Sequence, residues 1–476
     1  MLQPVGRDRV DVDFTGAEAR IEPLTWGQKA IWQDMQDSGN QFSMQGMMDL
    51  PGGSSIEDVA ARVSALLGRH AALRMRLRTD ETGRPCQEIA GSGQFGLDIL
   101  TFPDEADPDE VAQYRDHLFD TWHLERFDFT RDWPLRMAAL RHRGACRHLN
   151  WVLSHLAADG GGHMLLLDDL LADETAGGGA RPARHPDVLD IAGAEQTPQH
   201  RQLSSRTMRY WESQLRDIPA QTFGEPALPR GEAEPRYWQA RFRSPAAHLA
   251  MLAISRRTGT DLSRVTLAVI GAAIGRATGV SPLVLKVMVN NRFRPGLADV
   301  IAPIAQNSVV TIHVAGATVD EVVTRARGAS MTAGMRAYYD PDDLRAVMTR
   351  LDAERGYPAT VTCRVNDQRA MTMRSDEAAD QLALTPEEVT RKLPETSLTW
   401  LGRRDNMHEQ ANILIENRPG VVSLHIMWDR WSLTDAQVEA LLRAVEAVAV
   451  EAAFDPAAPT GVSRQDAGAS KAVRHR

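Results

Sequence analysis

Two ionisable side chains stand four residues apart in the segment SHLAADG (154–160), and their types suit proton transfer. The imidazole of His155 has a neutral form near working pH, so a ring nitrogen can accept a proton from an attacking amine or hydroxyl. Asp159 could orient that ring or brace the loop. An apolar run over 147–153 predicts a buried strand, and residues 163–171 predict a helix. The pair therefore lies in a strand-to-helix connection, a place where polar chemistry is often found.

An isolated histidine is more often a structural residue than a catalytic one. Two other patterns in the sequence could also indicate a functional site. His155, Asp159 and His163 repeat every four residues, which could place metal ligands on one helical face. The glycines at 160–162 should break such a helix, so no metal site is expected. Residues 91–96 contain GxGxxG, but residues 97–102 read as a strand, whereas a dinucleotide-binding loop requires a helix there. A hairpin tip is the better interpretation.

Hydrophobic periodicity predicts helices and strands along the whole chain. Ser55 and Asp58 form a capping pair for a helix over 56–67, and the period drops to two over 73–78, which predicts a half-buried strand. Further helices are expected over 205–215, 246–258, 263–278 and 434–452, and further strands over 283–289, 309–314 and 424–427. Residues 172–203 lack an apolar period and are rich in Gly, Pro and Ala, as in an exposed linker. The pattern indicates a two-lobed α/β (α+β layered) fold.

Composition narrows the classes of function. The 476 residues carry a net charge of -9, with 43% hydrophobic and 25% charged residues, which is ordinary for a globular protein and unfavourable for nucleic-acid binding. The three cysteines are far apart and suggest neither a disulfide framework nor a zinc site. No signal peptide and no apolar run of membrane-spanning length is found. We expect a cytoplasmic protein with no membrane and no nucleic-acid partner.

Seven segments resemble, in collinear order, the signature segments of the condensation domains of nonribosomal peptide synthetases. SHLAADG resembles their HHxxxDG sequence. The other six are LTWGQKAIW (24–32), RHAALRMRL (69–77), FDFTRDWPLRMAAL (127–140), RYWESQL (209–215), NNRFRPGLADVIAPIAQNSVVTIHV (290–314) and SLTWLGR (397–403). Each is degenerate alone, but their shared order makes coincidence a poor explanation.

The resemblance implies two chloramphenicol-acetyltransferase-like lobes that form a V-shaped pseudo-dimer with a central tunnel. The implied lobes are residues 16–175 and 205–455, with a linker over 176–204 and a disordered tail over 456–476. Carrier proteins would deliver phosphopantetheine-tethered substrates to the two ends of the tunnel.

The resemblance also implies roles for individual residues. His155 matches the second, functional histidine of the signature, which positions the acceptor nucleophile and can deprotonate it. Asp159 matches an aspartate that is mostly structural and pairs with an arginine, for which Arg292 is the candidate. Gly160 matches a glycine that lets the backbone approach the site, and its amide could help hold a developing oxyanion.

Four positions depart from the family pattern. Ser154 replaces the first signature histidine; by strand alternation it should point into the protein, opposite to His155, and support the loop through a hydroxyl hydrogen bond. Asn291 stands where a glycine usually precedes the arginine. Thr399 and Trp400 replace an Asn and a Tyr of the acceptor side, which predicts an unusual acceptor. Trp400 either narrows the tunnel or simply packs in the core.

The implied function is an acyltransferase that joins a carrier-bound acyl or aminoacyl thioester to a small amine or alcohol, forming an amide or an ester, in natural-product and antibiotic biosynthesis. No adenylation, carrier or thioesterase segment is found, so we expect a monomer that acts on an acyl or peptidyl carrier protein in trans. No metal and no bound cofactor is expected, with the carrier's phosphopantetheine arm as substrate tether. Two alternatives remain: an inactive relative that recruits a partner enzyme, and a coenzyme A-dependent acyltransferase of the same superfamily.

Overall fold

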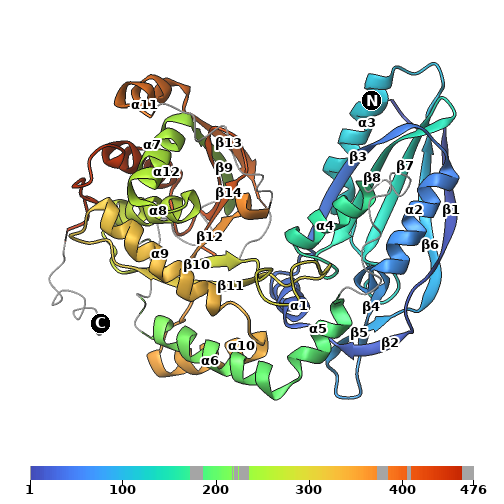
Figure 1. The fold of residues 1–476 in the computed structure, drawn as a ribbon, viewed down its shortest axis with the longest axis horizontal. Helices are drawn as coiled ribbons and strands as arrows, with labels where there is room; N and C mark the ends of the chain where they lie inside the picture. The colour runs from blue at the N-terminus through green and yellow to red at the C-terminus, as the bar shows by residue number, and fades with distance from the viewer. Residues whose placement is uncertain are drawn as a thin grey trace. The chain divides into compact units, whose positions relative to one another are not determined.

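The chain forms two compact units, each built around its own sheet (Figure 1). The computed structural model describes residues 2–171, 186–216, 218, 223, 235–371, 384–404 and 409–463. Unit 1 comprises Met1–Leu203 together with Asn290–Gln306, and unit 2 comprises Ser204–Val289 together with Asn307–Arg476. The segment 290–306, which the sequence places inside the second lobe, therefore belongs to unit 1.

Unit 1 contains a five-stranded sheet in the order β1 (Gly6–Thr15), β6 (Ser92–Thr101), β7 (Leu135–His142), β8 (Ala145–Ser154) and β3 (Ser43–Ser54). Only β6 and β7 run parallel; the other neighbours are antiparallel. A second, three-stranded sheet has the order β2 (Arg20–Pro23), β5 (Pro85–Ile89) and β4 (Met75–Thr79). The helices are α1 (Trp26–Ser38), α2 (Ile56–Arg69), α3 (Pro108–Thr121), α4 (Gly160–Leu171) and α5 (Val188–Glu195), with short 3₁₀ turns at Ala71–Arg74 and Trp122–Leu124.

Unit 2 is built on a seven-stranded sheet in the order β11 (Gln306–Ile312), β10 (Leu283–Val289), β12 (Cys363–Asp367), β14 (Ala411–Glu416), β15 (Val422–Asp429), β9 (Tyr237–Ser244) and β13 (Ser397–Arg403). Strands β10, β12 and β14 are parallel, and the remaining registered pairs are antiparallel. The helices are α6 (Pro198–Leu215), which begins in unit 1, α7 (Pro245–Thr258), α8 (Leu262–Thr278), α9 (Val319–Met335), α10 (Pro341–Arg355), α11 (Pro386–Lys392) and α12 (Asp435–Ala452), with 3₁₀ turns at Gln368–Met371 and Leu393–Glu395.

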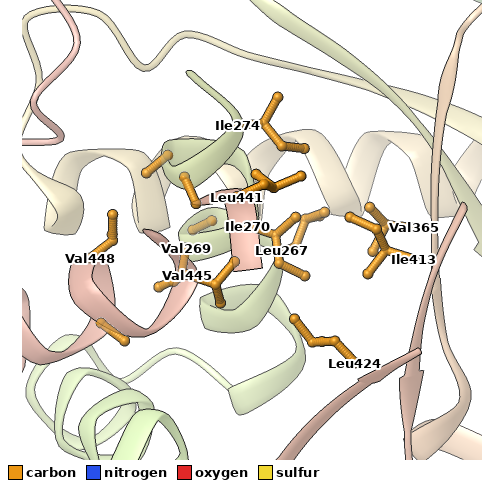
Figure 2. Close-up of a cluster of buried hydrophobic side chains, with 14 of the residues drawn as sticks. Leu267, Val269, Ile270, Ile274, Val365, Ile413, Leu424, Leu441, Val445 and Val448 are labelled. Atoms are coloured by element: carbon orange, nitrogen blue, oxygen red, sulfur yellow. The ribbon is translucent and has the colours of Figure 1, made fainter. Parts of the chain in front are cut away.

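The main core of unit 2 lies between one face of this sheet and helices α7, α8 and α12. Figure 2 shows Leu267 and Ile270 of α8 among side chains from α12 and from the strands. Eleven consecutive residues of α8, from Val265 to Gly275, are buried, because this helix is covered on several sides. Across the described part of the chain, no helix combines the length and the apolar character needed to cross a bilayer.

The elements predicted from strong periodicity are confirmed. Helix α2 has the expected capping box between Ser55 and Asp58, and β10, α7, α8 and α12 match their predicted ranges within one residue at each end. The strand expected over 73–78 begins later, at Met75, because a 3₁₀ turn precedes it. The interpretation of residues 91–96 as a hairpin tip was wrong, because Gly93 and Gly96 lie inside β6. No helix follows β6 directly, so the dinucleotide fingerprint lacks its required element.

The segment expected to be a linker over 176–204 is structured in its described part. Helix α5 buries Val188 and Ala192, and Asp187 caps it through a capping box with Asp190. The Glu195 carboxylate accepts a hydrogen bond from the Trp26 amide at 2.7 Å, so α5 holds the first turn of α1. The Gly- and Pro-rich composition concealed this short helix; residues 176–185 lie outside the described residues.

The expected ends of the lobes also differ from the structure. Strand β1 precedes residue 16 and pairs with β6 along its whole length, so unit 1 begins earlier than expected. Residues 456–463, assigned to the disordered tail, pack on unit 2: Ala458 and Val462 belong to its core, and the Val462 carbonyl accepts from the Gly316 amide at 2.8 Å. These few apolar residues find partners in distant segments, which local composition does not reveal. Residues 464–476 lie outside the described part.

Candidate functional site

The SHLAADG segment lies where β8 ends and α4 begins, as the sequence predicts. The His155 amide donates to the Phe42 carbonyl at 2.9 Å, and the Ser154 amide donates to the Pro134 carbonyl at 2.8 Å. These bonds tie the end of β8 to segments on both sides of it. Because side chains alternate along a strand, Ser154, the last residue of β8, lies on the side opposite to Trp151 and Leu153.

Ser154 is fully buried, and its hydroxyl oxygen accepts the Leu156 amide at 3.2 Å. This is the hydroxyl hydrogen bond expected for Ser154. A buried serine can hold the turn in this way without any change in charge, so the loop is supported even though the first signature histidine is missing.

The His155 side chain is half-buried, and its ring environment favours the neutral form. Burial lowers the pKa of His155, and the negative charges of Asp159 and Asp34 only partly oppose this shift. A neutral imidazole retains one basic nitrogen, so the ring can act as a proton acceptor at neutral pH.

The two ring nitrogens of His155 differ in their surroundings. Nδ1 is buried and has no hydrogen-bond partner of good geometry in the described part of the chain. A neutral imidazole carries its proton on one nitrogen and its lone pair on the other.

Asp159 is buried and accepts four hydrogen bonds, so its role in the loop is structural. Oδ1 accepts from the Gly162 amide at 2.8 Å and from Nη2 of Arg292 at 2.5 Å. Oδ2 accepts from the amides of Ile304 and Ala305 at 3.0 and 2.8 Å. One carboxylate thus joins the first turn of α4 to the segment 290–306, and the pairing expected between Asp159 and Arg292 is present.

The Arg292 guanidinium lies against the first turn of α4. Its Nη1 also donates to the Val300 carbonyl at 2.8 Å, which closes the loop 292–300 on itself. A Cβ atom at Gly161 would lie 2.1 Å from Arg292 Nε, a distance that no van der Waals contact allows. A close approach that requires glycine is therefore seen at Gly161.

Replacing Gly161 with alanine is expected to displace the Arg292 guanidinium and lower the stability of unit 1 by about 1–3 kcal/mol, the usual range for overpacking. Gly193, in α5 of the same unit, has no atom within 4 Å of its would-be Cβ, so Gly193→Ala is the matched control. Urea unfolding of both variants checks this prediction. Equal midpoints for the two variants would contradict it.

Asn291 stands where the family usually has a glycine, and its backbone conformation shows why asparagine is accepted there. Its φ is 57°, in the left-handed region that asparagine tolerates better than most residues. Its buried amide donates to the Ile304 carbonyl at 2.9 Å and accepts from Arg294 Nε at 2.9 Å. The side chain therefore fixes the turn that presents Arg292 to Asp159.

The variant Asn291→Val is expected to be about 1–2 kcal/mol less stable than Asn291→Gly, because a β-branched residue is strained at this positive φ. Both variants lose the amide hydrogen bonds, so the difference between them isolates the backbone strain. Chemical denaturation measures it, and equal stabilities would show that the turn relaxes to another conformation.

Gln28 connects the opening segment of the chain to the His155 loop. Together with Thr25 it forms a capping box at the start of α1, and its Nε2 donates to the Leu156 carbonyl at 3.4 Å and to Gln87 Oε1 at 3.1 Å. Next to it, a Cβ at Gly27 would lie 1.7 Å from the Pro303 carbonyl oxygen. The start of α1 thus contacts the His155 loop, Gln87 and Pro303, which are far apart in the sequence.

As expected, no single helix carries His155, Asp159 and His163, because α4 begins at Gly160, after the first two of them. The three glycines nevertheless do not interrupt α4 but form its first turn. The Asp159 carboxylate caps this turn, and Arg292 occupies the space that side chains would fill. The His155, Asp159 and His163 set does not resemble a metal site, because N–H donors occupy the Asp159 oxygens and Trp151 Nε1 lies 2.9 Å from His163 Nε2. No cluster with metal-ligand geometry occurs within the described ranges.

Thr399 and Trp400 lie on β13 in unit 2, on opposite faces of its sheet. Thr399 pairs with Arg241 of β9, on the polar face, whereas Trp400 pairs with Ala240, a core residue. The Trp400 ring meets the buried Trp428 edge-on, with 5.8 Å between centroids. Trp400 is nevertheless 41% exposed, so it covers Trp428 from the surface of unit 2 and is not a core residue.

The structure brings together Ser154, His155, Asp159, Gly160 and Arg292 in unit 1. The sequence-based reasoning missed Gly161, Gln28 as a contact of the loop, and the positive φ of Asn291. A signal was present for the first, because a glycine run directly after a candidate site indicates close packing. The contact of Gln28 with the loop could not be predicted, because the sequence does not show which loop packs against α1.

Comparisons with known proteins agree with this description. The condensation-domain family model matches residues 18–382. CymA of Salinispora arenicola, described as a probable non-canonical nonribosomal peptide synthetase, is 25% identical over 336 residues, which are 65% of this chain and 4% of that protein. The chain thus spans a small fraction of this relative.

Solved structures of low sequence identity share the fold. The condensation domain that mediates chain release from the enacyloxin polyketide synthase has a TM-score of 0.69 at 18% identity, with 91% of this chain and 83% of that one covered. The X-domain from teicoplanin biosynthesis, solved in complex with OxyB, has a TM-score of 0.64 at 18% identity, with 96% and 99% covered. The expected chloramphenicol-acetyltransferase-like α/β fold is confirmed, and the chain belongs to the condensation-domain family.

Proposed function

We propose that this protein is an acyltransferase that joins a carrier-bound acyl or aminoacyl thioester to an amine or alcohol. The observation that carries the proposal is His155: a half-buried imidazole at the end of β8 whose pKa is lowered and whose Nδ1 is buried, so we assign Nε2 as the base. Such a group suits the abstraction of a proton from an attacking nucleophile.

The proposed reaction needs only one base, His155, which takes up a proton in the first step and returns it in the second. Nε2 of His155 accepts the proton as the acceptor nitrogen or oxygen adds to the thioester carbonyl carbon. The carbon–sulfur bond then breaks, and the imidazolium returns its proton to the leaving thiolate of the phosphopantetheine arm. The Gly160 amide, at the first residue of α4, is our candidate for holding the oxyanion, because a helix N-terminus favours negative charge.

The proposal is tested by incubating the purified protein with acyl-loaded carrier proteins and a panel of amines and alcohols. Mass spectrometry detects both the deacylated carrier and the new amide or ester. Product that depends on the protein and on both substrates supports the proposal. Hydrolysis alone, or no product with any pair, counts against it.

The rate of product formation should stay near its maximum as the pH falls to about 6.5, the usual pKa of histidine, and decline only below it. Burial lowers the pKa of His155, so the neutral, basic form persists to lower pH than in a free histidine. An alcohol acceptor should be used for the profile, because it does not ionise in this range. An acid limb centred above pH 6.5 would contradict the assignment of His155 as the base.

A second candidate is a non-catalytic member that recruits a partner enzyme. The likeness to the X-domain, which was solved with OxyB, and the replacement of the first signature histidine by Ser154 favour it. It predicts saturable binding of an oxygenase or synthetase with no acyl transfer, and binding that His155→Ala leaves unchanged.

A further inference from the structure

A row of polar side chains crosses the middle of the sheet of unit 2. Strands β10, β12 and β14 are neighbours in this sheet (Figure 1). Lys286 of β10 is directly opposite Arg364 of β12, which is opposite Asn412 of β14. Their sequence neighbours Leu285, Cys363 and Ile413 face the main core, so by alternation the polar row faces away from it. Two like charges directly opposite each other on a sheet are unfavourable unless an anion compensates them.

One carboxylate supplies part of that compensation. Glu409 is 8% exposed; its Oε1 accepts from Lys286 Nζ at 3.1 Å and lies 3.8 Å from Arg364 Nε. Burial alone would raise the pKa of Glu409, but the charges of Lys286 and Arg364 outweigh it and lower the pKa to about 2. Glu409 is therefore ionised at every physiological pH, and it contributes one negative charge against two positive ones.

The remaining positive charge has an accessible hydrogen-bonding edge. Arg364 Nε donates to Asn412 Oδ1 at 3.2 Å, which fixes the plane of the guanidinium. Among the described residues, neither Nη group of Arg364 has a hydrogen bond or an ion pair, and the side chain is 24% exposed. These two groups form the planar fork that binds carboxylates and phosphates through two parallel hydrogen bonds.

Two neighbouring ionisable groups on this face add no net positive charge. Arg241 pairs with Glu416 at 2.9 Å. Burial, assisted by the charge of Arg241, lowers the pKa of His425, so its ring is neutral at neutral pH. Within the row itself, the unmatched charge is therefore at Arg364 and Lys286. Arg243 is a separate exposed cation on β9, three strands along from β12.

We infer that Arg364 and Lys286 form an anion-binding site on the polar face of the unit 2 sheet, and that it takes a carboxylate or phosphate group of a small molecule. Asn412 orients the guanidinium, Arg364 supplies the fork and Lys286 supplies the second charge. The inference goes beyond the proposed acyl transfer and does not depend on it, because the site would bind its anion whether or not His155 acts as a base.

The test is thermal unfolding of the full chain at constant ionic strength, with inorganic phosphate or succinate replacing chloride. A ligand that binds only the folded state raises the unfolding midpoint with its concentration. We expect at least one of the two probes to raise the midpoint of the wild type in a saturable way. In R364Q the concentration for half of the effect should rise at least about tenfold, and in R364K by less.

Arg243→Gln is the matched control, because Arg243 is an exposed arginine on the same face of the same sheet. It should keep the wild-type response. A stronger response to phosphate than to succinate identifies a phosphate ligand, such as the phosphate of a pantetheine arm; the reverse identifies a carboxylate-bearing substrate.

Three results would overturn the inference: no response of the wild type to either probe, an unchanged response in R364Q, or an equal loss in Arg243→Gln. R364Q should also fold at low ionic strength, because Lys286 and Glu409 still neutralise each other. If it does not fold, Lys286→Gln decides, since it should fold and lose the response. Failure of both variants to fold would show that both cations are structural, which rejects the site.

Discussion

The variant His155→Ala is expected to form product about 10²- to 10⁴-fold more slowly than the wild type, the usual contribution of a positioned general base. The loss should appear in the maximal rate, because the proton transfer belongs to the chemical step. Its fold should be retained. The ring makes no hydrogen bond of good geometry through the buried Nδ1 in the described part of the chain, and its backbone amide still donates to Phe42. Mass spectrometry of timed reactions measures the rate, and circular dichroism checks the fold.

His313→Ala is the control for this experiment, because its side chain is exposed in unit 2 and outside the proposed machinery. It should react at the wild-type rate. A folded His155→Ala variant with more than about a tenth of the wild-type rate would remove His155 as the base. The same result would direct attention to oxyanion stabilisation or positioning as the main source of catalysis.

Asp159→Ala is expected to lower the stability of the protein by about 3–5 kcal/mol, the usual loss when one partner of a buried ion pair is removed. The variant leaves the Arg292 guanidinium without its carboxylate and three backbone amides without their acceptor. The loss is large compared with a typical stability of about 5–15 kcal/mol. Urea unfolding followed by circular dichroism measures it.

The double variant Asp159→Ala with Arg292→Ala separates the contribution of the ion pair to stability from that of the backbone hydrogen bonds to Asp159. Removing both charges should recover part of the loss, because no buried charge is left unpaired. Arg443→Ala is the control, since Arg443 and Glu439 form an exposed pair on α12 that should contribute less than about 1 kcal/mol. Equal losses for Asp159→Ala and Arg443→Ala would show that the buried network does not stabilise the loop.

The rate and the stability of His155→Ala and Asp159→Ala together distinguish a residue that takes part in the chemistry from one that holds the loop in place. His155→Ala should lose rate without stability, whereas Asp159→Ala should lose both, because the carboxylate holds the loop that carries the histidine. If Asp159→Ala kept its stability and lost only rate, the aspartate would act directly on the chemistry.

Elements with strong local signals could be predicted from sequence. Helix α8 and strand β10 were located within one residue, because a long apolar period and a short apolar run between turns are each encoded by neighbouring residues. Helix α5 was missed, since eight residues in a Gly- and Pro-rich context give a weak period. It forms because Val188 and Ala192 are buried and Glu195 bonds to α1, contacts that are distant in sequence.

The sequence by itself determined the strand-to-helix setting of His155, and its ordered motifs indicated the family and made Arg292 the candidate partner of Asp159, because these depend on residue types in a fixed order. Only the tertiary structure decided that segment 290–306 belongs with unit 1. It also decided that Gly161 makes room for a guanidinium. It alone aligned Lys286 with Arg364 across two strands. The physical reason is that packing distances and sheet register join residues far apart in the chain, which local periodicity cannot encode.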